Sequence, residues 1–393
     1  MPAEPTRRWI LILGAVVAIG PLSIDMYLPG LPTLQRHFGS DAHAAQMSLA
    51  LFFAGLALGQ LVYGPVSDRY GRRAPLLAGL AIYIAATLGC AFAPSMPALI
   101  GLRFLQALGG CAGVVMTRAM VRDRFEPQDM ARILSLLLLV IGVAPILAPL
   151  LGSVVLQAAG WQAIFVVQAM FGLLCLAAVA RFIEETHTPP PGASLSFGSA
   201  LRGYAHLLRH RRFMGYALAG GTAQGGMFAY ISVSAFVFIE VYGLSPNGYA
   251  AVFGANAFGL IGAAQLNRWL LKRYPAQNVL RAALAVYFAG GLVLLGAALS
   301  GAGGLSGILL PLWLCITSLG FTFPNSVAAA MAPFGDRAGA ASGLLGTLQF
   351  VIAGGTAAIV GDWYDGSALP MAAVIALCGL GSNLLLHGVV RSR

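Results

Sequence analysis

Two charged side chains interrupt stretches of sequence that are otherwise apolar. Asp25 lies in GPLSIDMYLPGLP (Gly20–Pro32), within an otherwise apolar segment that is expected to run as a helix from Trp9 toward Pro32. Arg103 lies in LRFLQALGG, inside another apolar segment. If these segments cross a membrane, an ionised carboxylate within one costs about 2.5–3.5 kcal/mol or more, which makes it a functional candidate by default. Asp25 is therefore a candidate proton carrier, with Arg103 as the charge that influences it.

The composition predicts that these segments do cross a membrane. The chain has 393 residues, of which 59% are hydrophobic and 9% are charged, whereas soluble domains are roughly 45–50% apolar and about 25% charged. Segments of about 20 apolar residues, each long enough to cross about 30 Å of hydrocarbon as a helix, recur along the whole length. We predict an all-α membrane protein with twelve transmembrane helices.

Counting residues along the predicted helices places the two charges at similar depth. Asp25 is about 16 residues beyond Trp9, or roughly 24 Å into a 30 Å core. Arg103 enters from the other side, about six residues past Pro97, at roughly 9 Å from that edge. Three roles remain open for Asp25: a proton carrier, one member of a fixed ion pair that only packs the helices, or a hydrated carboxylate near the surface.

The basic residues predict the orientation of the helices. Loops such as AFAPSMP, LQAAGW and GAGGLSG carry no Lys or Arg, and Arg36 is the exception among the loops of this side. The alternate connections are rich in bases, which by the positive-inside rule predicts both termini in the cytoplasm. This distribution accounts for the net charge of +10 without nucleic acid. The basic groups lie at residues 7–8, 69–73, 122–124, 209–212 and 268–273.

A long polar stretch near the middle of the chain predicts two halves. We expect an N-terminal six-helix bundle over residues 1–184, a cytoplasmic linker over 185–211 and a C-terminal six-helix bundle over 212–393. The segment LRGYAHLLRHRR within this stretch is either a basic amphipathic helix on the inner leaflet or a solvated linker. Weak self-similarity pairs Gly55 with Gly259 and Arg69 with Arg273, as in transporters built from parallel six-helix repeats.

The connection between the second and third helices holds the most specific motif, GPVSDRYGRR. A positive-inside turn would explain its arginines but not the spacing of its glycines and aspartate. The motif resembles the pattern G-x-L-A-D-R-x-G-R-[RK] of the major facilitator superfamily, with Val66 and Ser67 in place of Leu and Ala. The matching residues are Gly64, Asp68, Arg69, Gly71, Arg72 and Arg73.

Two further helices carry partial matches to the same superfamily. In the fourth helix, Arg103 and Gln106 resemble the pattern R-x-x-Q-G-x-G, with Ala107 where a glycine is expected. In the fifth helix, APILAPLLGS retains Pro149 and Gly152 of the antiporter pattern G-x-x-x-G-P-x-x-G-G, with small residues replacing three glycines. Together with LSIDMYLPGLP and FTFPNS, these motifs resemble the bicyclomycin-resistance (Bcr/CflA) group of drug and proton antiporters.

The resemblance implies a fold of two pseudo-symmetric six-helix bundles around a central cavity. It also implies export of small amphipathic compounds across the bacterial inner membrane by proton antiport with alternating access. Asp25 and Arg103 would couple protons, and the polar residues expected to face the cavity would bind substrate or bond other helices. These are Tyr27, Gln106, Gln224, Tyr230 and Asn325. The expected gating residues are Gly64, Asp68, Arg69, Gly71, Arg72, Arg73, Asp123, Pro149 and Gly152.

Other classes of function are less well supported by the sequence. A facilitator or proton symporter that imports a nutrient is the nearest alternative. An intramembrane enzyme would need paired acids, histidines or a metal cluster that face one compartment, and the sequence offers no such group. We therefore expect no catalytic residues, metal or cofactor. The expected partners are a small-molecule substrate, protons and the lipid bilayer, with the protein acting as a monomer.

Overall fold

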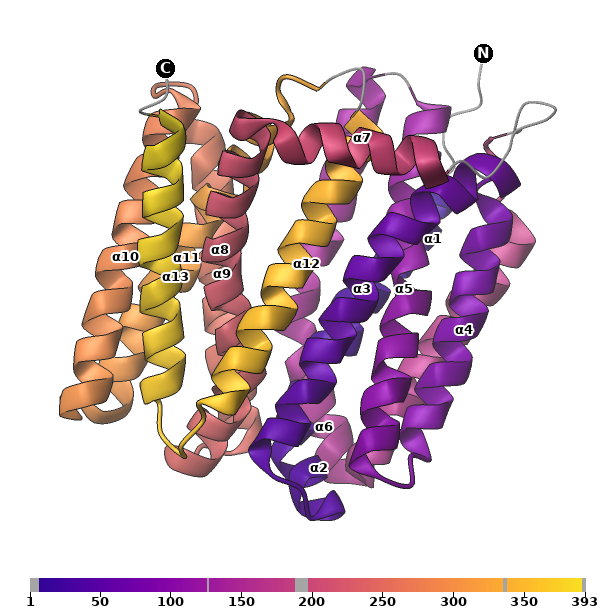
Figure 1. The fold of residues 1–393 in the computed structure, drawn as a ribbon. Helices are drawn as coiled ribbons and strands as arrows, with labels where there is room; N and C mark the ends of the chain where they lie inside the picture. The colour runs from indigo at the N-terminus through magenta and orange to yellow at the C-terminus, as the bar shows by residue number, and fades with distance from the viewer. Residues whose placement is uncertain (1–6, 126, 188–196, 335–337, 391–393) are drawn as a thin grey trace. The chain divides into compact units, whose positions relative to one another are not determined.

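The structure is a computed structural model that describes residues 7–125, 127–187, 197–334 and 338–390. All regular elements in these ranges are helical (Figure 1). The first half contains α1 (Arg7–Asp25), η1 (Leu28–Gly30), α2 (Leu31–Phe38), α3 (Ala42–Tyr70), α4 (Arg73–Ala91), α5 (Met96–Arg124) and α6 (Pro127–Phe182). The second half contains α7 (Phe197–Arg209), α8 (Arg211–Ala235), η2 (Phe236–Val241), α9 (Pro246–Leu270), α10 (Ala276–Ser300), α11 (Gly304–Met331), α12 (Ala338–Asp362) and α13 (Leu369–Val390).

The predicted twelve membrane spans are present in these helices. Eleven helices of the described chain are long and apolar enough to cross a membrane. One of them, Gly142–Phe182, lies in α6, which contains a non-helical residue at Gly160 with φ 81° and ψ 178°. The two arms of α6, 127–159 and 161–182, each exceed the roughly 20 residues that a crossing requires. Counting them separately yields twelve spans in an all-α membrane protein.

The first span is broken beside Asp25, and proline explains the position of the break. In a continuous helix the N–H of residue 29 would donate to the carbonyl of Asp25, but Pro29 has no N–H. The helix α1 accordingly ends at Asp25. The chain then passes through the short 3-10 turn η1 before α2 begins at Leu31. Asp25 is therefore the last residue of a helix that ends inside the membrane span.

The chain divides into two compact units, each described here by itself. Unit 1 comprises Met1–Gly30 and Leu51–Ala200, and unit 2 comprises Leu31–Ala50 and Leu201–Arg393. In unit 1, α1 packs on α5 and α6, and α4 packs on the same two helices. In unit 2, α8 packs on α11, α12 and α13. The boundaries expected at residues 184 and 212 stay a prediction, and residues 188–196 of the expected linker lie outside the described residues.

Matching glycines make the close helix contacts in the two units. In unit 1, a Cβ atom on Gly55 of α3 would collide with the carbonyl oxygen of Phe104 on α5. In unit 2, a Cβ atom on Gly259 of α9 would collide with Thr317 on α11. Small residues allow helices to approach closely in membranes, where packing rather than the hydrophobic effect drives helix association. The pairing of Gly55 with Gly259 from sequence thus corresponds to equivalent contacts in a repeated fold.

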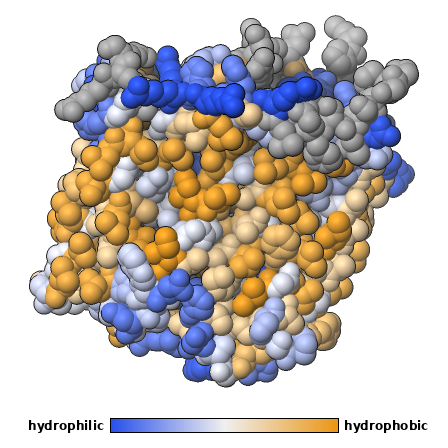
Figure 2. Space-filling model, in the orientation of Figure 1, coloured by the Kyte–Doolittle hydropathy of each residue, from blue (hydrophilic) through white to orange (hydrophobic). Residues whose placement is uncertain are grey.

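Apolar side chains cover the outside of the helices, as a lipid environment requires. Leu11, Leu174, Phe258 and Leu310 are each about 70% exposed. Figure 2 shows apolar side chains over the middle of the helices and hydrophilic side chains along α7. Most of the segment predicted as an amphipathic helix or a solvated linker is helical: residues 201–209 belong to α7, with Leu207 buried, and residues 211–212 begin α8. Its contact with a lipid leaflet stays a prediction.

Candidate functional site

A group of buried polar side chains lies in unit 1, where α1, α4, α5 and α6 meet. We call this group the buried polar cluster. Its helices are held close by glycines, since a Cβ atom on Gly109 of α5 would collide with the backbone of α4. All of its members are less than 3% exposed, and buried polar groups are costly unless they are hydrogen-bonded. The members are Ser23, Tyr83, Thr87, Arg103, Gln106 and Gln168.

Arg103 is the centre of this cluster. Its Nη1 donates to the backbone carbonyl of Ser23 at 3.0 Å and to the side-chain oxygen of Gln106 at 2.5 Å. Its guanidinium also lies 4.4 Å from the ring centre of Tyr27 and 4.2 Å from that of Phe52. Such cation–π contacts contribute about 2 kcal/mol or more when desolvated. Its Nε and Nη2 atoms have no hydrogen-bond partner among the described residues.

Gln106 links Arg103 to the neighbouring helices. Its Nε2 donates to the hydroxyl of Thr87 at 2.9 Å and to the side-chain oxygen of Gln168 at 3.1 Å. Gln168 in turn donates to the carbonyl of Leu22 at 3.2 Å. Both N–H groups of the Gln106 side chain thus donate to other residues of the protein, and its oxygen accepts from Arg103. We expected Gln106 to contact substrate or to bond another helix, and in this structure it bonds other helices.

Asp25 does not form an ion pair with Arg103. Its side chain is buried, at 4% exposure, and it makes no hydrogen bond or ion pair with any residue that the structure describes. Arg103 instead contacts Ser23 and Tyr27, on either side of Asp25. Asp25 thus lies between two residues that contact Arg103, and it forms no ion pair with Arg103 itself.

Several residues in and around the buried polar cluster were not predicted from the sequence. Ser23 also bonds the hydroxyl of Tyr83 at 2.8 Å, and Phe52 covers one face of Arg103. Gln168 could have been identified from the sequence, because it is a polar residue within a long apolar segment. Tyr83 and Phe52 could not, since aromatic residues are common in membrane helices. Tyr27, expected to contact substrate, is fully buried against Arg103 and Phe165.

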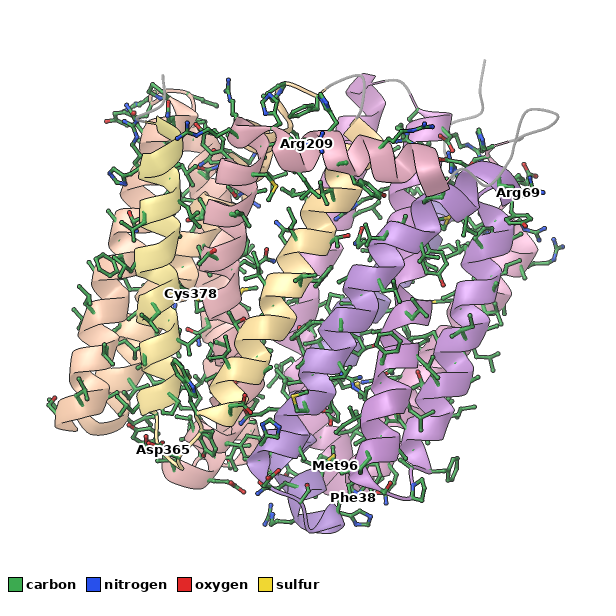
Figure 3. All side chains as sticks on the ribbon, in the orientation of Figure 1. Phe38, Arg69, Met96, Arg209, Asp365 and Cys378 are labelled. Atoms are coloured by element: carbon green, nitrogen blue, oxygen red, sulfur yellow. The ribbon has the colours of Figure 1, made fainter. Side chains whose placement is uncertain are left out.

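A second charged group lies at the opposite end of unit 1 from Met96, near Arg69 in the last turn of α3 (Figure 3). Its centre is Arg72, which is 3% exposed. Arg72 makes ion pairs with Asp68 and with Asp123, each at 2.8 Å. Its Nη1 also donates to the hydroxyl of Ser67 at 2.6 Å. We call these four residues the loop network; it ties α3 to α5 at the end predicted to be cytoplasmic. Ser67, a departure from the family pattern, thus supplies an additional bond.

Glu185 caps the start of α4 from a distant part of the sequence. Its carboxylate accepts the backbone N–H groups of Arg72 at 2.7 Å and Arg73 at 3.0 Å. These N–H groups lack partners within the helix. Partial burial opposes ionisation, but the hydrogen bonds from the backbone of Arg72, Arg73, His187 and Thr186 hold the pKa of Glu185 below its usual range. Gly71, with φ 78°, brings the backbone close to this carboxylate.

Replacing Glu185 with glutamine is therefore expected to lower the thermal stability of the protein at neutral pH. Because the folded-state pKa is depressed, the stabilisation is complete above the unfolded pKa of about 4.3 and is lost as pH falls below it. The difference in melting temperature between wild type and Glu185→Gln should thus shrink below about pH 4.3. Melting curves recorded over a pH series measure this difference. The control is Glu184→Gln, a substitution of the exposed neighbouring residue. A difference that is constant with pH would contradict this prediction.

The other residues expected to act in gating have distinct surroundings. The Arg69 guanidinium lies 5.3 Å from the ring centre of Tyr70, and Arg73 donates to the carbonyl of Ala180 at 2.6 Å. Pro149 is buried within α6. A Cβ atom on Gly152 would collide with the backbone of Met26, so this glycine permits the close contact of α1 and α6. Gly64 was expected to allow close packing, but a Cβ atom there would meet nothing within 4 Å.

Three expected substrate-binding residues lie in unit 2. Tyr230 accepts a hydrogen bond from Asn256 at 3.1 Å, and its ring stacks on Phe253. Asn325 donates to Asn267 at 2.8 Å. Gln224 differs, because its side-chain oxygen is buried without a hydrogen-bond partner in the described part of the chain. Of the three, Gln224 has the greatest capacity to bind a donor group on a ligand.

The fold and these motifs can be compared with known proteins. The family model of the Major Facilitator Superfamily matches residues 13–358. The chain belongs to the major facilitator superfamily. It is thus a multi-pass membrane transporter, as the motifs of the first half predicted, and the superfamily's members are transporters rather than enzymes. In the described residues no cluster of three metal-binding side chains occurs.

Curated relatives extend over nearly the whole chain. An uncharacterised MFS-type transporter, YdgK of Bacillus subtilis, is 33% identical over 388 residues, covering 97% of this chain and 95% of its own. The bicyclomycin resistance protein homolog of Haemophilus influenzae is 30% identical, with coverage of 98% and 96%. The multidrug resistance protein MdtL of Escherichia coli is 28% identical, with the same coverage. The resemblance to the bicyclomycin-resistance group is confirmed.

Among solved structures, the likeness is one of fold. The D-xylose–proton symporter has a TM-score of 0.76 at 14% sequence identity, covering 98% of this chain and 97% of its own. A bacterial homologue of the lysosomal transporter Spinster has a TM-score of 0.70 at 15% identity, with coverage of 99% and 96%. These matches support the two pseudo-symmetric six-helix bundles predicted from sequence.

Proposed function

We propose that this protein exports small amphipathic compounds from the cytoplasm in exchange for protons. The transport cycle would be one of alternating access in the bacterial inner membrane, with both termini in the cytoplasm. The relatives named for bicyclomycin, chloramphenicol and multidrug resistance support this substrate class. Proton exchange is supported by the chemistry of unit 1, and principally by one residue, Asp25.

The observation that carries the proposal is a buried carboxyl group, at the break in the first span, that has no partner among the residues that the structure describes. Asp25 is 4% exposed and ends α1, and Arg103, the partner expected from sequence, is bonded elsewhere. Ionisable groups inside membrane segments usually pair with one another or mark a proton or ion pathway. Asp25 is unpaired, which favours a proton carrier over the fixed ion pair that the sequence left open.

The remaining polar groups have supporting roles in this proposal. Arg103 fixes the segments on both sides of Asp25 by binding the carbonyl of Ser23 and the ring of Tyr27. The loop network would stabilise one state of the cycle by joining the predicted cytoplasmic ends of α3 and α5. Moving one proton through 100 mV supplies about 2.3 kcal/mol. This exceeds the roughly 1.4 kcal/mol needed to concentrate a neutral substrate tenfold.

Replacing Asp25 with asparagine tests the proposal. Asparagine keeps the shape and polarity of the side chain but cannot carry a proton. In inverted membrane vesicles with an imposed proton gradient, exported compounds should dissipate the gradient with wild type, and Asp25→Asn should reduce this flux to background. Because Asp25 makes no ion pair, binding of the same compound should change by less than about threefold, which is below 1 kcal/mol.

A matched control tests whether the loss of flux is specific to the carboxyl of Asp25. Asp41 caps the start of α3, where Oδ1 accepts the N–H of Ala44 at 2.8 Å, and asparagine caps helices equally well. Asp41→Asn should therefore retain wild-type proton flux. Full proton-driven export by Asp25→Asn would exclude Asp25 as the carrier. Proton movement in the same direction as substrate would indicate the symporter that the sequence analysis left as an alternative.

A further inference from the structure

An apolar groove lies in unit 2, beside the hydrogen bond from Asn325 to the carbonyl of Phe321. Its volume is about 450 Å³, and all its lining residues come from α9, α10, α11 and the turn between α9 and α10. We call it the α10 groove. Its lining residues include Leu270, Tyr274, Asn278, Val286, Leu314 and Phe321. This volume falls in the range of ligand sites in proteins, about 300–1,000 Å³.

The arrangement of three helices explains the groove. The helix α11 packs against both α9 and α10. Over the described residues, α9 and α10 have no comparable contact with each other. The close approach of α9 to α11 depends on small residues, since a Cβ atom on Gly320 would collide with the carbonyl of Leu260. The space between α9 and α10 is therefore left open, with α11 as its floor.

The groove has the length of a lipid chain in one leaflet. Along α10 it extends from Asn278 to Val286, which at 1.5 Å per residue is about 12 Å. One leaflet contributes about half of the 30 Å hydrocarbon core. The groove starts near the first residue of α10 and ends near mid-span. Val286 and Leu314 in its walls are 41% and 42% exposed, so it opens onto the surface that lipid contacts.

Positive charge gathers at the mouth of the groove. Lys272 and Arg273 are exposed in the tight turn between Leu270 and Tyr274, both of which line the groove. The turn is fixed by backbone hydrogen bonds, in which the N–H groups of Arg273 and Tyr274 both donate to Leu270 at 2.9 Å. The sequence contains no Asp or Glu between Glu240 and Asp336. No acidic side chain of α9, α10 or α11 therefore neutralises these bases.

We propose that the α10 groove binds an acyl chain of an anionic phospholipid, with the lipid phosphate held by Lys272 and Arg273. Basic pockets between transmembrane helices on the cytoplasmic side bind anionic lipid head groups, and each base near the surface contributes about 1 kcal/mol. The apolar walls match a hydrocarbon chain, and the unneutralised bases match a phosphate. A cationic amphipathic drug would be repelled by the same charges.

Tryptophan fluorescence offers a direct test, because Trp313 lies next to the groove residue Leu314 and is 42% exposed. A variant keeping only Trp313, with the other four tryptophans changed to phenylalanine, would be reconstituted in phosphatidylcholine vesicles. Phosphatidylglycerol or phosphatidylcholine with brominated chains would then be titrated in. Half-maximal quenching should need about thirtyfold less of the brominated phosphatidylglycerol, because two bases at about 1 kcal/mol each favour the anionic lipid.

Two variants test the two parts of the proposal. Lys272→Gln with Arg273→Gln should make the two brominated lipids equally effective. Ala282→Phe, at an exposed lining residue, should fill the groove and lower the maximal quenching by both lipids. The matched controls are Arg211→Gln with Arg212→Gln, two exposed bases at the start of α8, and Ala289→Phe, an exposed position on α10 outside the groove. Both controls should behave as wild type.

Lipid retention provides a second measurement that needs no tryptophan changes. Full-length wild type extracted from mixed vesicles should retain one more phosphatidylglycerol in native mass spectrometry than the Lys272→Gln, Arg273→Gln variant. Equal quenching by the two lipids with wild type would overturn the assignment to an anionic lipid. Unchanged quenching and unchanged retention with Ala282→Phe would overturn occupation of the groove.

Discussion

Replacing Arg103 with methionine is expected to reduce proton-coupled transport to background while leaving a folded protein. Methionine has similar length and retains contact with Tyr27 and Phe52, but it cannot donate to the carbonyl of Ser23. Arg103 joins the last turn of α1 to Tyr27 beyond the helix break. Without it, the segment that carries Asp25 loses its fixed position, which would prevent coupled proton transfer.

The stability change should be small because opposing contributions nearly cancel. Hydrogen bonds to a charged group contribute about 1.5–3 kcal/mol each, and each desolvated cation–π contact contributes about 2 kcal/mol. Against these stand several kcal/mol for burying the cation and about 1–3 kcal/mol for each unpaired N–H. Arg103 has two hydrogen bonds, two ring contacts and two unpaired nitrogen atoms. We expect a net change of about 2 kcal/mol or less.

Proton flux in inverted vesicles measures coupled transport, and thermal unfolding in detergent measures stability. Arg281→Met is the control, because Arg281 is an exposed arginine on α10; it should retain both transport and stability. Arg103→Lys should transport weakly, since an ammonium cannot stack between two rings as a planar guanidinium does. Wild-type flux with Arg103→Met would contradict the positioning role. Unfolding of this variant would show that Arg103 is primarily structural.

Replacing Gly152 with alanine is expected to destabilise the protein by about 2 kcal/mol, and valine should destabilise it further. Overpacking in a close contact costs about 1–3 kcal/mol. The group that the new Cβ atom meets is the backbone of Met26, which cannot move aside by changing rotamer. The better helix propensity of alanine offsets about 1 kcal/mol of this cost. Transport should also fall, because Met26 follows Asp25 directly.

Thermal unfolding followed by gel filtration of the detergent-solubilised protein checks this prediction. Gly101→Ala on α5 is the matched control, because a Cβ atom there meets nothing within 4 Å. It should be as stable as wild type or up to about 1 kcal/mol more stable. Equal melting temperatures for Gly152→Ala and Gly101→Ala would show that α1 and α6 can separate at little cost.

The sequence predicted the membrane spans and the family for physical reasons. Each span must satisfy its own backbone hydrogen bonds and match the hydrocarbon thickness, so hydropathy alone locates it. The break at Asp25 was also foreseeable, because the missing N–H of Pro29 is a local property. The loop motif indicated the superfamily because the spacing of Gly64, Asp68 and Gly71 is specific. These features depend on residues that are close together in sequence.

Tertiary structure decided which polar groups meet. The depth of a residue in the membrane follows from the helical rise of 1.5 Å per residue. The sequence alone therefore predicted similar depths for Asp25 and Arg103. The direction in which a side chain points depends on how its helix is rotated about its own axis. Packing contacts, such as that of Gly152 with Met26, determine this rotation. Packing of α1 on α5, together with the helix break after Asp25, brings the carbonyl of Ser23 and the ring of Tyr27 to Arg103, and Asp25 has no ion-pair partner among the described residues. Helix packing also brings Gln106 to Gln168, which are hydrogen-bonded. In the same way the folded chain places Glu185 at the start of α4, although the two are more than a hundred residues apart in sequence. Such contacts join distant segments and leave no local pattern in the sequence.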